Sequence, residues 1–166
     1  FKIFKNIKNK MEEEINSILI NGDCLELMKD IPDKSIDAII CDLPYGITAC
    51  KWDNVIPFEP LWEQYERIIK DDGAIVLFGS QPFTSALIMS NPKLFKYEWV
   101  WEKSKTSNYV HCKYQPLKAH ENILVFSKYP AAQNSAKKNM VYNPQFTIAE
   151  PYNKGKVSNS NGVLTG

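Results

Sequence analysis

Apolar positions along the chain recur with two different periods, which predict alternating strands and helices. Short apolar or alternating runs bounded by turn residues are typical of strands. They predict strands over 17–21, 36–41, 74–78, 97–102 and 123–126. The run over 36–41 is nearly continuous, which predicts a strand buried on both faces in a parallel sheet.

Helical periodicity separates these strands. It predicts a short helix over 24–31, closed by Pro32, a longer one over 57–70 that stops at Asp71-Asp72-Gly73, and a third from about Pro82 to Ser90. The stretch 43–57 is predicted to be a loop. The order of elements predicts an α/β fold with a mostly parallel sheet and helices on its faces. The last two strands have no helix between them and can pair antiparallel at the edge.

Length and composition predict one globular domain. The chain has 166 residues, of which 44% are hydrophobic and 23% charged, and this excludes disorder over most of its length. After Lys128 the periodicity is lost, which is typical of an extended insert or a mobile tail. The apolar runs are far shorter than the roughly 20 residues that cross a bilayer. The basic start, 1–10, lacks the apolar core of a signal peptide, so we expect a cytoplasmic protein.

The four cysteines do not predict a metal site or a disulfide framework. They stand at unrelated spacings and form no C-x-x-C pair: Cys24, Cys41, Cys50 and Cys112. We expect buried, reduced thiols, because free cysteine is among the most buried residue types.

Charge is distributed unevenly around a net value of +1. Residues 1–100 carry eleven basic and sixteen acidic side chains, whereas 101–166 carry nine lysines and three acids. A basic half beside an acidic half suggests a polyanion contact confined to one region. A lysine-rich solvated surface explains the same counts equally well.

The segment Asp42-Leu43-Pro44-Tyr45-Gly46 follows the most apolar predicted strand. Ligands of open α/β sheets bind outside the carboxyl ends of the strands, so a site is expected here. The exocyclic amine of a planar base needs acceptors for its N–H groups and a surface on which to stack. Asp42 and a backbone carbonyl offer the acceptors, and Tyr45 offers the surface. From these residues alone, a strand-ending Asp with a proline turn and a core Tyr is the more common arrangement.

The same segment resembles the D-P-P-Y motif of the amino-group DNA methyltransferases, which act on adenine N6 or cytosine N4. Other segments resemble parts of that family in the same order. They are Ile20-Asn21-Gly22-Asp23-Cys24, the stretch 31–37, Lys51-Trp52-Asp53, the stretch 73–79, Trp101-Glu102-Lys103 and the stretch 118–126. The similarity runs over about residues 18–128. Several ordered segments make it far more specific than the short motif alone.

A catalytic motif near the start of the chain resembles the circularly permuted beta group, in which the catalytic half precedes the target-recognition region and the cofactor half. The resemblance implies a Rossmann-like S-adenosylmethionine-dependent methyltransferase fold, incomplete here. It implies an N-terminal extension over 1–16, a catalytic region over 17–128, and the start of a target-recognition region or a mobile tail over 129–166. The implied function is methyl transfer from S-adenosylmethionine to the exocyclic amine of a flipped base in double-stranded DNA, within restriction-modification.

The resemblance also assigns the catalytic residues Asp42, Leu43, Pro44 and Tyr45. Asp42 and the Leu43 carbonyl would accept hydrogen bonds from the amine, while Tyr45 would stack on the flipped base. Asp rather than Ser at the first position of the motif favours adenine N6. Leu43 stands where the family usually has Pro; its carbonyl offers the same acceptor, so the change affects loop rigidity more than chemistry.

Residues outside the motif receive less specific roles. By the family pattern Asp23 and Cys24, together with Asp42, contact the cofactor, although Asp23 serves equally well as the N-cap of a helix. Lys103 and His120, with Tyr45, would contact the target nucleotide or a phosphate, and a solvated surface position is an equal alternative for both. Trp52 and Asp53 lie on the loop after the motif, where one role is to close over the site, and packing of Trp52 into the core is the stronger expectation.

The glycine-rich F-x-G-x-G strand end that holds the methionine part of the cofactor has no counterpart, because 161–166 lacks the preceding strand and aromatic residue. This departure implies a missing C-terminal half or a partner chain that supplies the motif, and little activity in the isolated chain. The alternatives are a non-catalytic DNA-binding remnant, or a methyltransferase that acts on RNA or on a protein amide.

Overall fold

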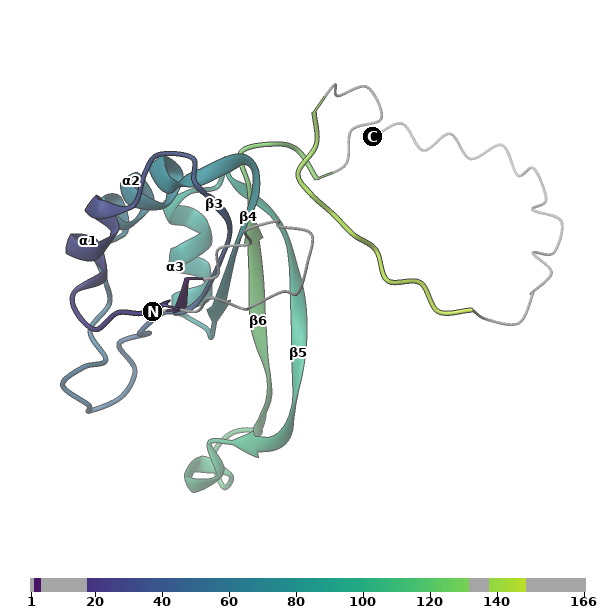
Figure 1. Ribbon diagram of the computed structural model, residues 1–166. Coiled ribbons are helices and arrows are strands. Elements are labelled where there is room, and N and C mark those ends of the chain that lie inside the picture. Colours follow the sequence, from purple (N-terminus) through teal and green to yellow (C-terminus); the bar gives the residue numbers. More distant parts are fainter. Residues whose placement is uncertain (1, 4–17, 132–137, 149–166) are drawn as a thin grey trace, which may run out of the picture.

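The computed structural model describes residues 2–3, 18–131 and 138–148 (Figure 1). Almost all of the predicted N-terminal extension, 1–16, and most of the predicted C-terminal region, 129–166, lie outside the described residues. Within the described part of the chain, every helix is too short or too polar to span a bilayer.

Four strands form one mixed sheet in the order β3-β4-β6-β5. The strand β3 (Ile36–Asp42) is parallel to β4 (Ile69–Gly79), whereas β6 (Lys118–Phe126) is antiparallel to both β4 and β5 (Phe95–Ser107). The α/β fold is confirmed, as is the antiparallel pairing of the last two strands. The prediction of a mostly parallel sheet is wrong for these four strands. A hairpin rather than a helix connects β5 to β6, so β6 enters the sheet antiparallel to both neighbours.

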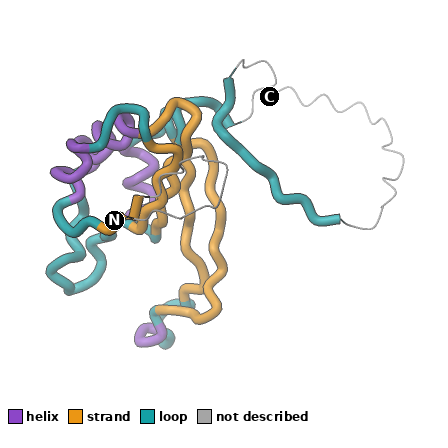
Figure 2. Tube along the Cα trace, in the orientation of Figure 1, coloured by secondary structure: helices purple, strands orange, loops and turns teal. Residues whose placement is uncertain are grey.

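The helices gather on one face of this sheet (Figures 1 and 2). They are α1 (Cys24–Leu27), which continues into a 3-10 turn (Met28–Asp30), α2 (Phe58–Ile68) and α3 (Phe83–Ser90). Their apolar side chains form one core with the inward residues of the sheet, which include Ile39, Ile75, Leu77, Leu124 and Phe126. The hydrophobic contact between these two layers is the main source of stability of the fold.

The strand β3 is not buried on both faces as predicted. It lies at the edge of the four-stranded sheet, and Ile40, on the side away from the core, is 57% exposed. Its neighbours Ile36 and Ile39 are buried in the core. The nearly continuous apolar run therefore reflects one buried face and one exposed face.

The helix α2 passes directly into β4, without the turn that the sequence predicts at Asp71-Asp72-Gly73. These three residues lie inside β4, at an irregularity in its pairing with β3. Ile36 of β3 pairs with Ile69 of β4, whereas Ala38 pairs with Ala74. Gly73 is required there, because a Cβ atom would lie 2.7 Å from the Asp37 carbonyl oxygen.

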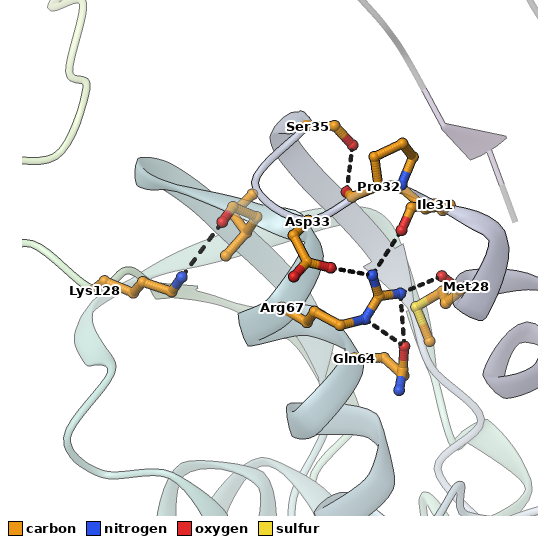
Figure 3. Close-up of polar contacts among 9 residues, drawn as sticks. Met28, Ile31, Pro32, Asp33, Ser35, Gln64, Arg67 and Lys128 are labelled. Atoms are coloured by element: carbon orange, nitrogen blue, oxygen red, sulfur yellow. Dashed lines mark hydrogen bonds and ion pairs between the residues drawn. The ribbon is translucent and has the colours of Figure 1, made fainter.

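Arg67, the only arginine in the sequence, joins the end of α2 to the segment that precedes β3 (Figure 3). Its guanidinium donates hydrogen bonds to the carbonyl oxygens of Met28 (2.6 Å) and Ile31 (2.7 Å) and to Asp33 Oδ1 (2.6 Å). It thereby satisfies the Ile31 carbonyl at the end of the short helical segment and gives a second donor to the Met28 carbonyl, which also accepts the Ile31 N–H.

A separate two-stranded antiparallel sheet contains β1 (Lys2–Ile3) and β2 (Ile18–Leu19). The strand predicted over 17–21 is thus present in shortened form, outside the main sheet. Ile18 and Leu19 are largely exposed.

Candidate active site

The predicted site lies at an edge of the sheet where three strands meet. Asp42, the last residue of β3, pairs with Phe78 of β4, and Gly79, the last residue of β4, pairs with Asn122, the middle residue of β6. The carboxyl ends of β3 and β4 are therefore level with the middle of β6. This edge has the geometry of a ligand site in an open α/β sheet.

Asp42 and Tyr45 interact directly at this edge. The Tyr45 hydroxyl donates a hydrogen bond of 2.7 Å to Asp42 Oδ1, while the Asp42 residue stays exposed. The Tyr45 ring is half-buried and packs against Phe83 of α3, with 5.1 Å between ring centroids. Burial, followed by the Asp42 carboxylate, raises the pKa of Tyr45 well above its ordinary value, so the hydroxyl stays protonated and acts as a donor.

The two residues between them anchor the motif. Leu43 is only 5% exposed and belongs to the hydrophobic core, and Pro44 is half-buried. Leucine at this position thus supplies a core side chain that holds the backbone of the motif. This anchoring offsets the loop rigidity that is lost because the usual proline is absent.

A buried carboxylate fixes the loop that follows the motif. Asp53 is 6% exposed and accepts hydrogen bonds from the backbone N–H groups of Gly46 (2.8 Å), Ile47 (2.9 Å) and Thr48 (2.7 Å). The Thr48 side chain and these N–H groups lower the pKa of Asp53 to about 2, so it is ionised at neutral pH. Gly46 has φ of +69°, and a Cβ atom there would lie 2.8 Å from Val55 Cγ2, so the turn requires glycine.

Two other predictions are wrong. Trp52 is 74% exposed instead of packing into the core, because the loop turns inward at its neighbour Asp53. The four cysteines are free, but they are not buried: Cys24 and Cys41 are half-buried, and Cys50 and Cys112 are exposed.

Asp23 caps the helix α1, which was one of its two predicted roles. Its Oδ1 accepts a hydrogen bond of 2.8 Å from the Leu25 N–H. Cys24, the first residue of α1, packs against the same core as Cys41, which directly precedes Asp42. Burial raises the pKa of both thiols. The charge of Cys24 also contributes to the raised pKa of Cys41, so the start of α1 lies within electrostatic range of the end of β3.

Lys103 and His120 reach the same edge through the β5–β6 hairpin. Lys103 Nζ forms a 2.5 Å ion pair with Glu121 Oε1, and both side chains are largely shielded from solvent. The charge of Glu121 also contributes to the raised pKa of Tyr45, which places Glu121 within electrostatic range of the motif. His120 is exposed and pairs with Glu102 across the hairpin.

From the sequence, Asp53 is expected only on the loop that follows the motif, where it could close over the site with Trp52, and Glu121 has no assigned role. The hydrogen bonds of Asp53 reach back five to seven residues to consecutive N–H groups, a pattern that no short motif encodes. The alternation of β6 hints at the orientation of Glu121, but its partner Lys103 can be identified only once the register of the hairpin is known.

The chain is similar in sequence and in fold to known methyltransferases. The chain is 29% identical over 148 residues to the type II methyltransferase M.HinfI of Haemophilus influenzae, a match that covers 71% of this chain and 41% of that protein. It is 37% identical over 123 residues to the type II methyltransferase M.BamHI of Bacillus amyloliquefaciens, covering 60% and 29% respectively. The chain matches no protein-family profile.

Among solved structures, the cytosine-N4-specific PvuII DNA methyltransferase superposes with a TM-score of 0.50 at 15% identity, over 80% of this chain and 58% of that one. The fold is therefore a partial α/β methyltransferase fold, and the expected resemblance to DNA amino-methyltransferases is confirmed. The chain spans less than half of the length of the two type II methyltransferases that it matches.

Proposed function

We propose that this chain carries the base-binding half of the active site of a DNA amino-methyltransferase, with residues 17–128 as the catalytic region. The reaction is transfer of a methyl group from S-adenosylmethionine to adenine N6 of a flipped base in double-stranded DNA. The observation that carries the proposal is the exposed Asp42 carboxylate at the carboxyl end of β3, oriented by Tyr45 within the D-P-P-Y-like segment.

Asp42 and Leu43 are the acceptors for the target amine. Tyr45 occupies Oδ1 of Asp42, so Oδ2 is the oxygen available to the amine N–H. The Leu43 carbonyl is the second acceptor, and the buried Leu43 side chain holds it in position. Two fixed acceptors draw on the N–H groups and localise the nitrogen lone pair as the new bond forms, which is electrostatic preorganisation. Proton loss follows methylation, so the site needs no strong base.

Tyr45 supports the flipped base with its ring. A base that leaves the duplex loses its stacking neighbours, and an aromatic side chain in the pocket restores part of that energy. The contact between Tyr45 and Phe83 holds the ring against α3, so it does not have to be ordered when the base arrives.

S-adenosylmethionine supplies an electrophilic methyl group when it is bound. Asp23 and Cys24 fit its adenosine end. One oxygen of the exposed Asp23 carboxylate accepts the hydrogen bond from the Leu25 N–H, and the other oxygen is available to the cofactor. Cys24 is within electrostatic range of Cys41, the residue before Asp42, which supports a cofactor position between the start of α1 and Asp42. The choice of adenine rather than cytosine as the target base rests on Asp at the first position of the motif, as in the family pattern.

The test is transfer of labelled methyl groups from S-adenosylmethionine to mixed-sequence duplex DNA, followed by digestion to nucleosides and mass spectrometry. It uses the 166-residue chain, and also a chimera in which its residues 18–128 replace the matching segment of M.BamHI. We expect N6-methyladenine and a loss of at least about 100-fold in Asp42→Ala, the scale of losing one preorganised polar contact. Asp30→Ala, which removes an exposed carboxylate elsewhere, is the matched control.

An unchanged rate in Asp42→Ala would remove Asp42 from the mechanism. Label in N4-methylcytosine would overturn the choice of base, and label in RNA or in protein amides would overturn the choice of substrate.

A further inference from the structure

The β5–β6 hairpin extends well beyond the rest of the sheet. Gly79, the last residue of β4, is level with Asn122, and Asn122 pairs with Val100. Residues 101–121 therefore lie past the end of β4, and Figure 1 shows them projecting from the body as a two-stranded ribbon. We call residues 101–121 the overhanging ribbon. At about 3.3 Å per residue, its β5 strand alone reaches roughly 20 Å beyond the sheet.

The overhanging ribbon starts from the edge that holds the candidate active site. Asp42 pairs with Phe78, one residue before the end of β4, and Glu121 at the base of the ribbon influences the pKa of Tyr45. A molecule that lies along the ribbon therefore also passes Asp42 and Tyr45.

Beyond the two acids at its base, the charge of the ribbon has one sign. Between its two flanking acids, Glu102 and Glu121, the stretch 103–120 contains four lysines and two histidines and no acidic residue. Within the described part of the chain, Lys103 is paired with Glu121, whereas Lys105 and Lys113 are exposed and form no ion pair. The tip thus presents uncompensated positive charge, which favours a polyanion.

The tip also carries exposed aromatic and apolar side chains. Tyr109, Val110 and Tyr114 are 70%, 80% and 86% exposed. Aromatic rings and lysines interleaved on one projecting element are typical of a surface that contacts bases as well as phosphates.

We propose that the overhanging ribbon enters the major groove of duplex DNA beside the target base. This inference rests on the proposed function and adds the surface that holds the duplex. The major groove of B-DNA is about 12 Å wide and admits a two-stranded β-ribbon, whereas the major groove of an RNA duplex is too narrow for side chains to read. In this position Lys105 and Lys113 contact phosphates on the groove walls, and Tyr109 and Tyr114 contact base edges.

The experiment measures binding of the full chain to a labelled duplex by fluorescence anisotropy at salt concentrations from about 50 to 200 mM. The first variant is Lys105→Gln with Lys113→Gln, and the second is Tyr109→Ser with Tyr114→Ser. The matched control neutralises two exposed lysines far from the ribbon, Lys29→Gln with Lys93→Gln. Circular dichroism checks that each variant is folded.

We expect the Lys105/Lys113 variant to bind about tenfold more weakly at intermediate salt. The slope of log affinity against log salt should fall by about 2, which corresponds to two lost phosphate contacts, while the control keeps the wild-type slope. The Tyr109/Tyr114 variant should lose affinity without a change of slope. Glucosylated hydroxymethylcytosine fills the major groove and leaves the phosphates unaltered, so a duplex that contains it should bind the wild type less tightly than plain DNA.

Wild-type affinity and slope in both ribbon variants would overturn the inference, as would equal binding of duplex RNA or of glucosylated DNA, or no DNA binding by the wild type. These outcomes are separate from the proposed function, which is read from methyl transfer and its dependence on Asp42. A chain that binds DNA through the ribbon but transfers no methyl group would contradict the proposed function and leave the ribbon contact in place.

Discussion

The Tyr45 hydroxyl lies 2.7 Å from Asp42 Oδ1, and the two residues are three positions apart at the end of β3. The contact turns the carboxylate so that one oxygen is occupied and the other is presented at the edge of the sheet. The Tyr45 ring is held by Phe83, so the orientation of Asp42 depends on the packing of α3 as well as on the motif. In the proposed mechanism Tyr45 therefore has two separable roles: its hydroxyl positions Asp42, and its ring receives the base.

The first prediction separates these roles. Tyr45→Phe keeps the ring and removes the donor, so we expect kcat of methyl transfer to fall about 5- to 10-fold with little change in KM for DNA, which corresponds to one hydrogen bond to a charged group. Tyr45→Ala also removes the stacking surface and should lose a further 10-fold or more. Steady-state kinetics on both variants make the comparison, and equal rates for Tyr45→Phe and the wild type would show that the hydroxyl does not position Asp42.

The second prediction concerns Asp53 and pH. The pKa of Asp53 in the folded chain is about 2, below its ordinary value of 3.8. Its contribution to the free energy of unfolding is therefore complete above about pH 4 and is lost as the pH falls towards 2. Asp53→Asn cannot accept all three backbone hydrogen bonds, so it should be less stable at pH 7 and should lose less stability between pH 4 and pH 2.

Urea unfolding at several pH values tests this expectation, with Asp30→Asn as the control for removing an exposed carboxylate. Parallel pH curves for the wild type and Asp53→Asn would contradict the assignment. Because the loop directly follows Tyr45, Asp53→Asn should also lower kcat/KM about 10-fold or more, the usual cost of a small misplacement.

Local sequence patterns were sufficient to predict the elements that build the core. The periodicity of α2 and the apolar centre of β4 are local signals, and both elements formed near the predicted positions. The β5–β6 hairpin was predicted too short. Strands were expected over 97–102 and 123–126, whereas β5 covers Phe95–Ser107 and β6 covers Lys118–Phe126. The added residues are mostly polar and exposed, so no burial pattern marks them.

The residues of the candidate site likewise fall into those that the sequence identifies and those that it does not. Asp42, Leu43, Pro44 and Tyr45 are contiguous, so a short motif could identify them. The positions of Glu121 and of the overhanging ribbon depend on the order β3-β4-β6-β5 and on strand register, which are tertiary properties. The position of β6 between β4 and β5 was missed for that reason as well, because it leaves no local signature.

The third prediction concerns Tyr65, whose side chain is completely buried in the core. Among the described residues, its hydroxyl is the only buried side-chain nitrogen or oxygen atom without a hydrogen-bond partner within bonding geometry, and the Cys41 thiol is the polar group beside it. Leaving a buried hydroxyl unpaired costs about 1–3 kcal/mol, so Tyr65→Phe should raise the free energy of unfolding by about 1 kcal/mol. Tyr65→Leu, which opens a cavity, should instead lower it by about 2 kcal/mol or more. A marked loss of stability in Tyr65→Phe, measured by urea unfolding, would reveal a partner for the hydroxyl.

The fourth prediction compares two ion pairs in this chain. Lys103 and Glu121 pair diagonally across the hairpin at 2.5 Å, with side chains only 25% and 18% exposed. Lys29 of the 3-10 turn and Glu26 of α1 pair at 2.7 Å, with side chains 57% and 68% exposed. Solvent screens the second pair far more than the first.

A double-mutant cycle with Lys103→Met and Glu121→Gln should therefore give a coupling free energy of about 1 kcal/mol. The cycle with Lys29→Met and Glu26→Gln should give about 0.3 kcal/mol.

Repeating both cycles at higher salt concentration separates the two pairs further. Added salt should remove most of the Lys29–Glu26 coupling and leave much of the Lys103–Glu121 coupling. The same cycle measured on methyl transfer shows whether the pair matters for the site. If Glu121 acts only by holding Lys103 at the base of the overhanging ribbon, the two single variants and the double variant should lose similar amounts of DNA affinity. If the Glu121 charge acts on Tyr45 directly, Glu121→Gln should alter kcat while Lys103→Met alters only DNA binding. Equal, salt-independent coupling in both pairs would contradict the view that shielding from solvent distinguishes them.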